Sequence, residues 1–268
     1  MSLSRLSGSA SRLLSDLRFG RRYQGLRFAR RYDRGKGFED HEANLIRLLE
    51  GRFALDGAIV VDIGTGTGQM AKRVGSRVGH FYGFDVSSSM ISVAMAWRRS
   101  HALGSAITFG VAAATEIPLP DQTADIVIYP WSMNSIIAPH WEGDWQGALG
   151  QVLGEATRLC REGGSIVVVE TASLMGELPW GEIWHPIRRG FLAALEQRHG
   201  FRSTLFANDW NFRTARNARR YAELWFTPET VRQVLRSGTT VLHECAGIWY
   251  TKVSSPAPCE EAPVLGST

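Results

Sequence analysis

The sequence predicts an α/β protein whose core is a doubly wound, mostly parallel sheet. A short apolar run at 59–61 ends at Asp62 and leads through Gly64, Gly66 and Gly68 into a helix that begins near Gln69. Further apolar runs of strand length alternate with helical patterns: strands at 80–84, 106–111, 124–129 and 165–169, helices at 38–51, 69–78 and 146–159. Because strands that alternate with helices are typical of parallel sheets, we expect this architecture.

Length and composition fit one globular domain. The chain has 268 residues, of which 44% are hydrophobic and 21% charged, so it can bury a sizeable core. No apolar run approaches membrane-spanning length, and we expect no membrane partner. Cys160, Cys245 and Cys259 are scattered, with neither metal-ligand nor disulfide spacing. We therefore expect a cytoplasmic protein without a bound metal.

Both ends of the chain differ in composition from its middle. Nine arginines and two acids lie between Ser2 and Arg34, within a net charge of +4. We interpret 1–31 as a basic arm, either disordered or folded as a lid, although its Arg and Ser content is also typical of an organellar transit peptide. No nucleic-acid motif accompanies the arginines, so we expect no nucleic-acid partner. The Pro-, Ser- and Ala-rich tail at 254–268 is expected to be disordered.

The glycine loop predicts a ligand of nucleotide type. Glycines let the backbone approach a ligand closely, and the following helix offers free N–H groups. The dinucleotide pattern G-x-G-x-x-G fails because Gln69 stands at its last position, and no Gly-Lys-Ser/Thr triplet follows. The pattern that remains, D-x-G-x-G-x-G after a strand, resembles motif I of the class I methyltransferases that use S-adenosylmethionine (SAM).

A second segment supports the same resemblance. The strand at 80–84 ends in Asp85, and Gly83, Asp85, Ser87 and Met90 match the phrase G-x-D-x-S-x-x-M of that family. A carboxylate at this position accepts two hydrogen bonds from the vicinal hydroxyls of a ribose. The resemblance covers about 32–170 well and the rest of 32–253 loosely, and it implies a Rossmann-like sheet of seven strands.

The resemblance implies SAM as the cofactor and S-adenosylhomocysteine as the product. Ala113 stands where the family often has an Asp for the adenine amino group, so backbone groups of Ala113 and Ala114 are expected to reach the base. The expected cofactor-binding residues are Tyr32, Asp62, Gly64, Thr65, Gly66, Gly68, Asp85, Val86, Met90, Ala113, Ala114, Tyr129 and Pro130.

The methyl acceptor is expected at the carboxyl end of the fourth strand and under an aromatic-rich insertion at about 173–217, after the fifth strand. Ligands of open α/β sheets bind at this edge, and aromatic walls suit a flat or cationic small molecule. The expected substrate-binding residues are Trp131, Met133, Asn134, Trp184, His185 and Trp210.

The predicted function is methyl transfer from SAM to a small molecule by direct in-line displacement, to oxygen or nitrogen rather than carbon, by a monomer or homodimer. His185 and Glu170 are the candidates for a general base, although methyl transfer depends mainly on positioning and can proceed without one. Two alternatives stay open: a methyltransferase-like isomerase or cyclase, and a non-catalytic SAM-binding assembly factor.

Overall fold

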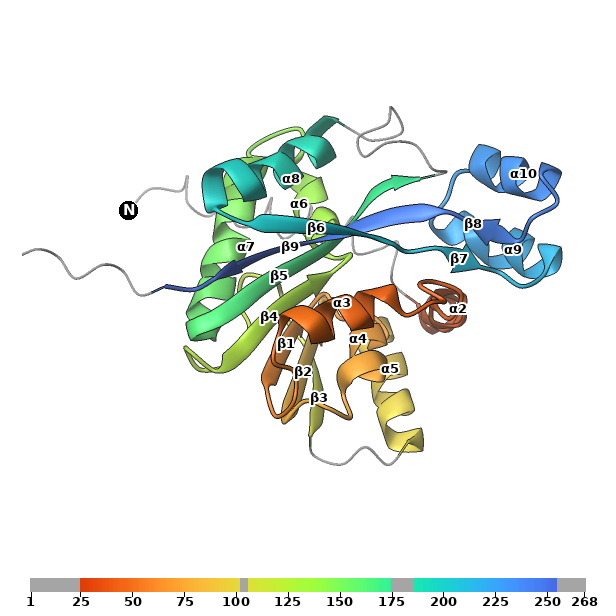
Figure 1. The fold of residues 1–268 in the computed structure, drawn as a ribbon. Helices are drawn as coiled ribbons and strands as arrows, with labels where there is room; N and C mark the ends of the chain where they lie inside the picture. Colours follow the sequence, from red (N-terminus) through yellow and green to blue (C-terminus); the bar gives the residue numbers. More distant parts are fainter. Residues whose placement is uncertain (1–24, 102–105, 175–185, 255–268) are drawn as a thin grey trace, which may run out of the picture.

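The structure, a computed structural model, describes residues 25–101, 106–174 and 186–254 (Figure 1). Its centre is a seven-stranded sheet in the order β3-β2-β1-β4-β5-β9-β6. Strand β9 pairs antiparallel with both β5 and β6, so it alone runs against the other six. The strands are β1 (Ile59–Ile63), β2 (His80–Asp85), β3 (Ile107–Val111), β4 (Ala124–Pro130), β5 (Cys160–Leu174), β6 (Arg202–Ala207) and β9 (Glu244–Lys252). The predicted doubly wound, mostly parallel sheet is confirmed.

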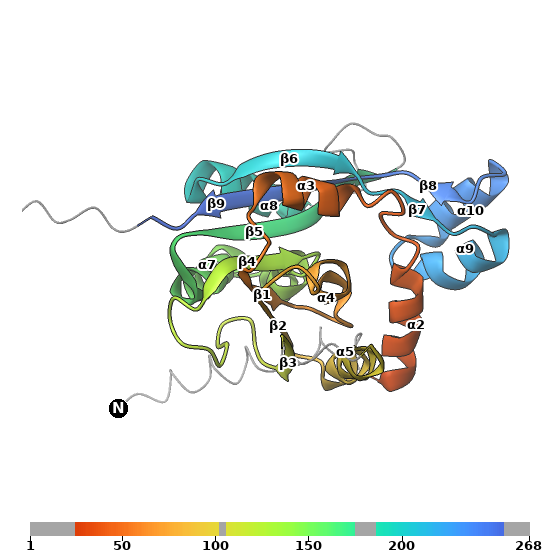
Figure 2. The ribbon, with the colours of Figure 1, turned by 60° about the horizontal axis from the view of Figure 1, so that its bottom comes forward.

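Helices cover both faces of the sheet, which explains why its strands are apolar on both sides. One face carries α3 (Asn44–Arg52), α4 (Gln69–Val74) and α5 (Ser88–Ser100). The other carries α6 (Met133–Ile137), the 3-10 turn η2 (Ala138–His140), α7 (Trp145–Leu159) and α8 (Pro186–His199) (Figures 1 and 2). None of the helices within the described ranges is long and apolar enough to cross a membrane.

A small module follows β6 and has an apolar core of its own. It comprises β7 (Trp210–Asn211), α9 (Ala215–Tyr221), the 3-10 turn η3 (Ala222–Leu224), α10 (Pro228–Arg236) and β8 (Val241–Leu242). Its core gathers aromatic and aliphatic side chains: Trp210, Phe212, Ala218, Tyr221, Ala222, Phe226, Val234 and Leu242. The insertion was expected at 173–217, but β6 within that range pairs with β9 in the main sheet. The separate module therefore extends later, to Leu242.

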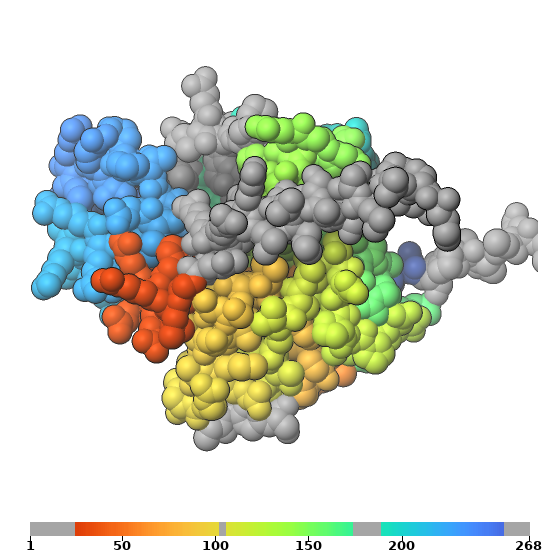
Figure 3. All heavy atoms as spheres, turned by 180° about the vertical axis from the view of Figure 1, so that it is seen from behind, coloured from red at the N-terminus to blue at the C-terminus, as the bar shows by residue number. Residues whose placement is uncertain are grey.

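Helix α2 (Leu26–Lys36) joins this module to the rest of the fold. Its buried Ala29 packs with Met90 and Val93 of α5, while its other side contacts α9 (Figures 2 and 3). The expected border between arm and domain, at 31/32, lies inside this helix. The helix expected from 38 begins only at Asn44, because Asp40 turns the chain and its carboxylate accepts the backbone N–H of Asn44 (2.8 Å).

Candidate functional site

The turn between β1 and α4 consists of backbone conformations that favour glycine. The φ angles of Gly64, Gly66 and Gly68 are 77°, 55° and 78°. A Cβ on Gly64 would lie 2.3 Å from the Cβ of Ser132, and one on Gly68 would lie 2.9 Å from the ring of Phe109. A Cβ on Gly66 would meet nothing within 4 Å. Two glycines are thus fixed by packing, whereas Gly66 leaves the loop backbone open to a ligand.

Asp62 lies at the base of this loop and is fully buried. The Thr65 hydroxyl donates to its Oδ2 at 2.7 Å, whereas Oδ1 has no hydrogen-bond partner within the described part of the chain. Burial raises the pKa of Asp62 to about 8; Asp85 also raises it, and the bond from Thr65 opposes the shift. At neutral pH this carboxyl is therefore mostly protonated, with one polar atom left for a ligand.

Asp85 ends β2 and lies directly against the glycine loop. Its Oδ2 accepts the backbone N–H of Gly66 at 2.9 Å, and its Oδ1 accepts that of Ser87 at 2.8 Å. Burial raises the pKa of Asp85, although these two N–H groups oppose the shift. Each carboxylate oxygen keeps a second lone pair, so the group can still accept bonds from two neighbouring hydroxyls. The exposed side chain of Val86 offers apolar surface beside it.

A cavity of about 50 Å³ lies between the loop, α2 and the end of β4. It is lined by Tyr32, Lys36, Glu39, Gly64, Thr65, Gly66, Gln69, Met70, Arg73, Pro130 and Trp131. A larger cavity, of about 890 Å³, lies at the opposite edge of the sheet near Arg52, Asp125 and Tyr250, and no expected site residue lines it. Since ligands of open α/β sheets bind at the carboxyl ends of strands, the smaller cavity is the candidate site.

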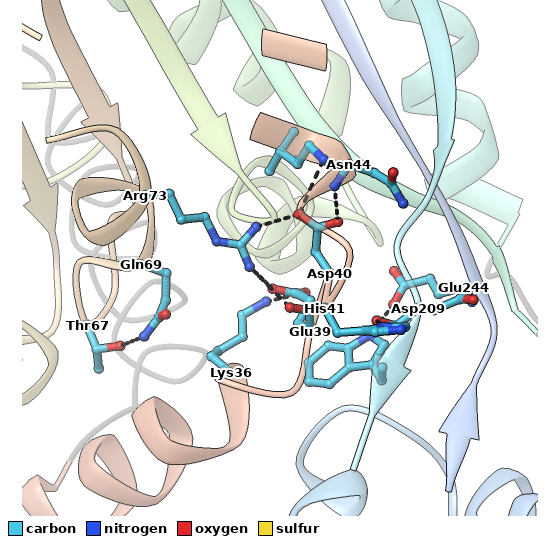
Figure 4. A network of polar contacts seen from close by, with 12 residues as sticks. Lys36, Glu39, Asp40, His41, Asn44, Thr67, Gln69, Arg73, Asp209 and Glu244 are labelled. Carbon is cyan, nitrogen blue, oxygen red and sulfur yellow. Dashed lines mark hydrogen bonds and ion pairs between the residues drawn. The ribbon is translucent and has the colours of Figure 1, made fainter. Parts of the chain in front are cut away.

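Charged side chains on one side of this cavity form a buried network of ion pairs (Figure 4). The Lys36 ammonium donates to Glu39 at 2.5 Å, and Arg73 pairs with Asp40 at 2.9 Å and with Glu39 at 3.8 Å. Lys36, Glu39 and Asp40 are each 5% exposed. Sequence reasoning missed this network because its members look like ordinary surface charges of a helix end and a turn.

A further buried carboxylate, Glu244, lies at the start of β9. Its Oε2 accepts the indole N–H of Trp210, and it also bonds to Thr171. Burial, followed by the charge of Glu39, raises the pKa of Glu244 to about 7; the two hydrogen bonds and Lys36 oppose that shift. At neutral pH this side chain is thus close to half-ionised.

Three tryptophans surround the Lys36 ammonium. Its Nζ lies 4.5 Å from the ring centroid of Trp131, 5.3 Å from that of Trp210 and 5.9 Å from that of Trp225. Trp131 has a φ of 53°, which is rare for a bulky residue and costs backbone strain. Trp210, an expected substrate residue, and Trp225 come from the small module, so the module completes this group of rings.

Two expected residues have side chains in the core, away from the cavity. The Tyr129 side chain is fully buried in the core under α7, where its hydroxyl donates to the carbonyl of Val152 at 3.1 Å. Met133 is fully buried in the same core. Tyr129 shares the core face of β4 with Val127, two residues earlier, because side chains alternate along a strand. Neither side chain reaches the cavity beside the glycine loop.

The remaining expected residues fall into three groups. Met90 is buried between α5 and α2, and Ala113 forms an isolated bridge with Glu116 beyond β3. Glu170 is fully buried and accepts the backbone N–H of Asn134 at 2.9 Å, while the Oδ1 of Asn134 is buried with no partner in the described residues. Trp184 and His185 lie outside the described residues, so their roles stay predictions.

Residues 61–168 match a family described as "Methyltransferase domain". Over this segment, which runs from β1 to β5, the chain is similar to methyltransferase domains. Two ubiquinone/menaquinone biosynthesis C-methyltransferases match it: that of Hahella chejuensis is 30% identical over 134 residues, and that of Bartonella tribocorum 28% over 124. These alignments cover 47% and 45% of this chain, and the chain spans 50% and 43% of the respective relatives, about half their length.

Several solved structures share the fold of this chain over most of its length. The YcgJ protein of Bacillus subtilis has a TM-score of 0.52 at 14% identity, with 81% of this chain and 100% of that chain covered. Geranyl diphosphate C-methyltransferase of Streptomyces coelicolor, solved with S-adenosylhomocysteine, has a TM-score of 0.52 at 15% identity, with 79% of each chain covered. The [4+2]-cyclase SpnF has a TM-score of 0.51 at 22% identity, with 78% of this chain and 81% of that chain covered.

Proposed function

We propose that the chain is a SAM-dependent methyltransferase that acts on a small molecule. The observation that carries the proposal is the placement of Asp85, whose carboxylate is fixed against the open backbone of Gly66 by two N–H bonds. A carboxylate at the end of the second strand, beside a glycine turn, suits the ribose of a nucleoside ligand such as SAM, which carries no phosphate.

The residues present fit SAM. Asp85 would hold the ribose hydroxyls, with Val86 and the backbone of Ala113 and Ala114 beside adenine. The open loop at Gly66 and the orphaned oxygen of Asp62 would receive the amino-acid end. When bound there, SAM supplies an electrophilic methyl group on a sulfonium. The contribution of this chain is to hold the reactants in line and to exclude water, which accounts for most of the barrier reduction in such transfers.

The acceptor atom is a separate question. We expected oxygen or nitrogen rather than carbon, but both curated relatives are named C-methyltransferases, so that preference has no support from them. A cyclase of similar fold shows that the fold alone does not fix the chemistry. Release of S-adenosylhomocysteine in the presence of an acceptor would distinguish methyl transfer from cyclisation or isomerisation.

Calorimetric titration with SAM and with S-adenosylhomocysteine tests the cofactor site. Replacement of Asp85 by Asn keeps the shape of the side chain and removes its charge, and we expect affinity to fall by roughly 10- to 100-fold, as for lost charged hydrogen bonds. Asp56→Asn is the matched control, since Asp56 is exposed at the opposite edge of the sheet and should bind as the parent does. Absence of binding by folded parent protein would overturn the proposal.

A further inference from the structure

The ammonium of Lys36 has unused hydrogen-bonding capacity in a buried place. An ammonium carries three N–H donors, and Lys36 bonds only to Glu39 among the residues that the structure describes. Its side chain is 6% exposed, so solvent does not readily serve the other two. Buried donors without partners cost free energy, which makes a ligand that supplies acceptors favourable here.

A second donor close by is also unsatisfied. The indole Nε1 of Trp131 is buried and has no hydrogen-bond partner in the described chain, and Lys36 Nζ lies 4.5 Å from the centroid of that ring. Trp131 also has a positive φ of 53°, and backbone strain of this kind concentrates at functional sites. Two independent donors of the chain thus share one buried location.

This location belongs to the same cavity as the glycine loop. Lys36 and Trp131 line it together with Gly64 and Gly66. A molecule held by Lys36 therefore lies beside the loop that we propose receives the amino-acid end of SAM. The inference drawn from this position rests on the proposed function.

The nearby carboxylates are already satisfied, which argues against a cationic ligand. Glu39 accepts from Lys36 and pairs with Arg73, and Asp40 is bonded to Arg73 and to the start of α3. Glu244 accepts from Trp210 and bonds to Thr171. The two groups with unused capacity beside the tryptophans, Lys36 Nζ and the indole N–H of Trp131, are both donors, so an oxygen with negative charge suits them better than a second ammonium.

We propose that Lys36 and the indole N–H of Trp131 form an oxyanion subsite for the methyl acceptor, a flat ring that bears an ionisable hydroxyl, either a phenol or an enol. The rings of Trp131, Trp210 and Trp225 provide flat apolar walls, and binding releases the hydroxyl proton to solvent. A deprotonated phenol or enol carries negative charge on oxygen and on ring carbon. This acceptor class therefore serves methylation at either atom.

The subsite is tested with 4-nitrophenol, whose ionised form is recognised by its visible absorbance. The probe is titrated into full-length protein saturated with S-adenosylhomocysteine, over a range of pH. We expect the pKa of the bound probe to fall by about one unit, a tenfold preference for the ionised form. In Lys36→Met this shift should disappear, and in Trp131→Phe, which keeps a ring but removes the N–H, it should shrink.

Two controls keep the test decisive. Removing Lys36 leaves Glu39 buried without its main partner, so the neutral double variant Lys36→Met/Glu39→Gln guards against loss of folding. Lys252→Met removes the same charge from the exposed far end of β9 and should bind the probe as the parent does. Binding of S-adenosylhomocysteine by each variant shows that the cofactor site is intact.

Three results would overturn the proposed subsite. They are tighter binding of benzyltrimethylammonium than of 4-nitrophenolate, no binding of 4-nitrophenol by cofactor-loaded parent, or an unchanged probe pKa. Loss of S-adenosylhomocysteine binding in folded Lys36→Met protein would instead assign Lys36 to the cofactor. If the parent itself binds no cofactor, the proposed function fails first, and the subsite falls with it.

Discussion

At the scale of single residues, Glu244 combines complete burial with a pKa near neutrality. Burial and Glu39 raise that pKa from 4.5 to about 7. A carboxyl with a raised pKa in the folded state loses stabilising free energy as pH rises from its unfolded pKa through its folded one. Glu244→Gln, which cannot ionise, should therefore gain stability over the parent between pH 5 and pH 8, by a difference on the order of 2–3 kcal/mol.

Urea unfolding of both proteins at pH 5, 6.5 and 8 measures this difference. The exposed Glu142→Gln provides the control and should show the same free energy of unfolding as the parent throughout. An equal effect of Glu244→Gln at pH 5 and at pH 8 would show that Glu244 does not titrate in this range.

Sequence reasoning located residues of the site where the signal is local. Asp62 and Asp85 lie at the ends of β1 and β2, and the three glycines follow β1, so their place at the sheet edge can be predicted from the chain alone. Lys36, Glu39 and Glu244 could not be found in this way, because their roles depend on burial created by contacts over some 200 residues of chain. The core-facing side chain of Tyr129 could not be told from the sequence either, because an apolar strand covered on both faces does not show which face each residue occupies.

At the scale of elements, helix α7 contains two exposed glycines at positions where a larger residue would fit without a clash. A Cβ on Gly150 or Gly154 would meet no atom within 4 Å. Because glycine in a helix interior is less favourable than alanine by about 1 kcal/mol, Gly150→Ala should raise the free energy of unfolding by roughly that amount. Chemical denaturation monitored by circular dichroism would measure the gain.

The same helix supplies the contrasting variant. A Cβ on Gly147 would lie 2.1 Å from Oδ2 of Asp144, whose Oδ1 accepts the Gly147 N–H and caps α7. Gly147→Ala should therefore gain less than Gly150→Ala, or lose stability, because the cap must shift. A similar gain in both variants would contradict the assignment of Asp144 as the cap.

The elements themselves were predictable to different degrees. Strands β1 to β5 were found because helices cover both faces of this part of the sheet and each strand reads as an apolar run. The start of α3 was placed six residues early, since the apolar positions that indicate this helix lie mainly at 45–49 and do not mark its first residue. Helix α3 starts after Asp40, which has a positive φ and accepts the N–H groups of Asn44 and Leu45. Asp40 also pairs with Arg73, a tertiary contact that no local pattern reveals.

At the scale of the whole molecule, two parts contribute differently to the site. The groups that the proposed function assigns to the cofactor come from the sheet, its glycine loop and the turns after β2 and β3, whereas Trp210 and Trp225 of the module provide two walls around Lys36. The module has its own apolar core and meets the rest of the fold partly through α2, as Figure 3 shows from behind. Damage to the module should therefore affect the acceptor more than the cofactor.

Phe226→Ala tests this division of labour. Phe226 is buried in the module core, 5.3 Å from Trp210 between ring centroids, and truncation of a buried phenylalanine typically costs 3–5 kcal/mol. We expect hydrogen exchange to speed up over 210–242 while β1, β4 and β5 stay protected. Binding of S-adenosylhomocysteine should persist, whereas 4-nitrophenol binding should weaken at least tenfold.

Leu195→Ala is the counterpart, since Leu195 of α8 is fully buried against the main sheet rather than in the module. A cavity there should lower the stability of the sheet and so weaken the binding of both ligands together once unfolding sets in. If Phe226→Ala instead abolishes cofactor binding while the sheet stays protected, the module also shapes the cofactor site. The binding of both ligands would then depend on one cooperative structure, and a substitution that changes the acceptor subsite would also change cofactor binding.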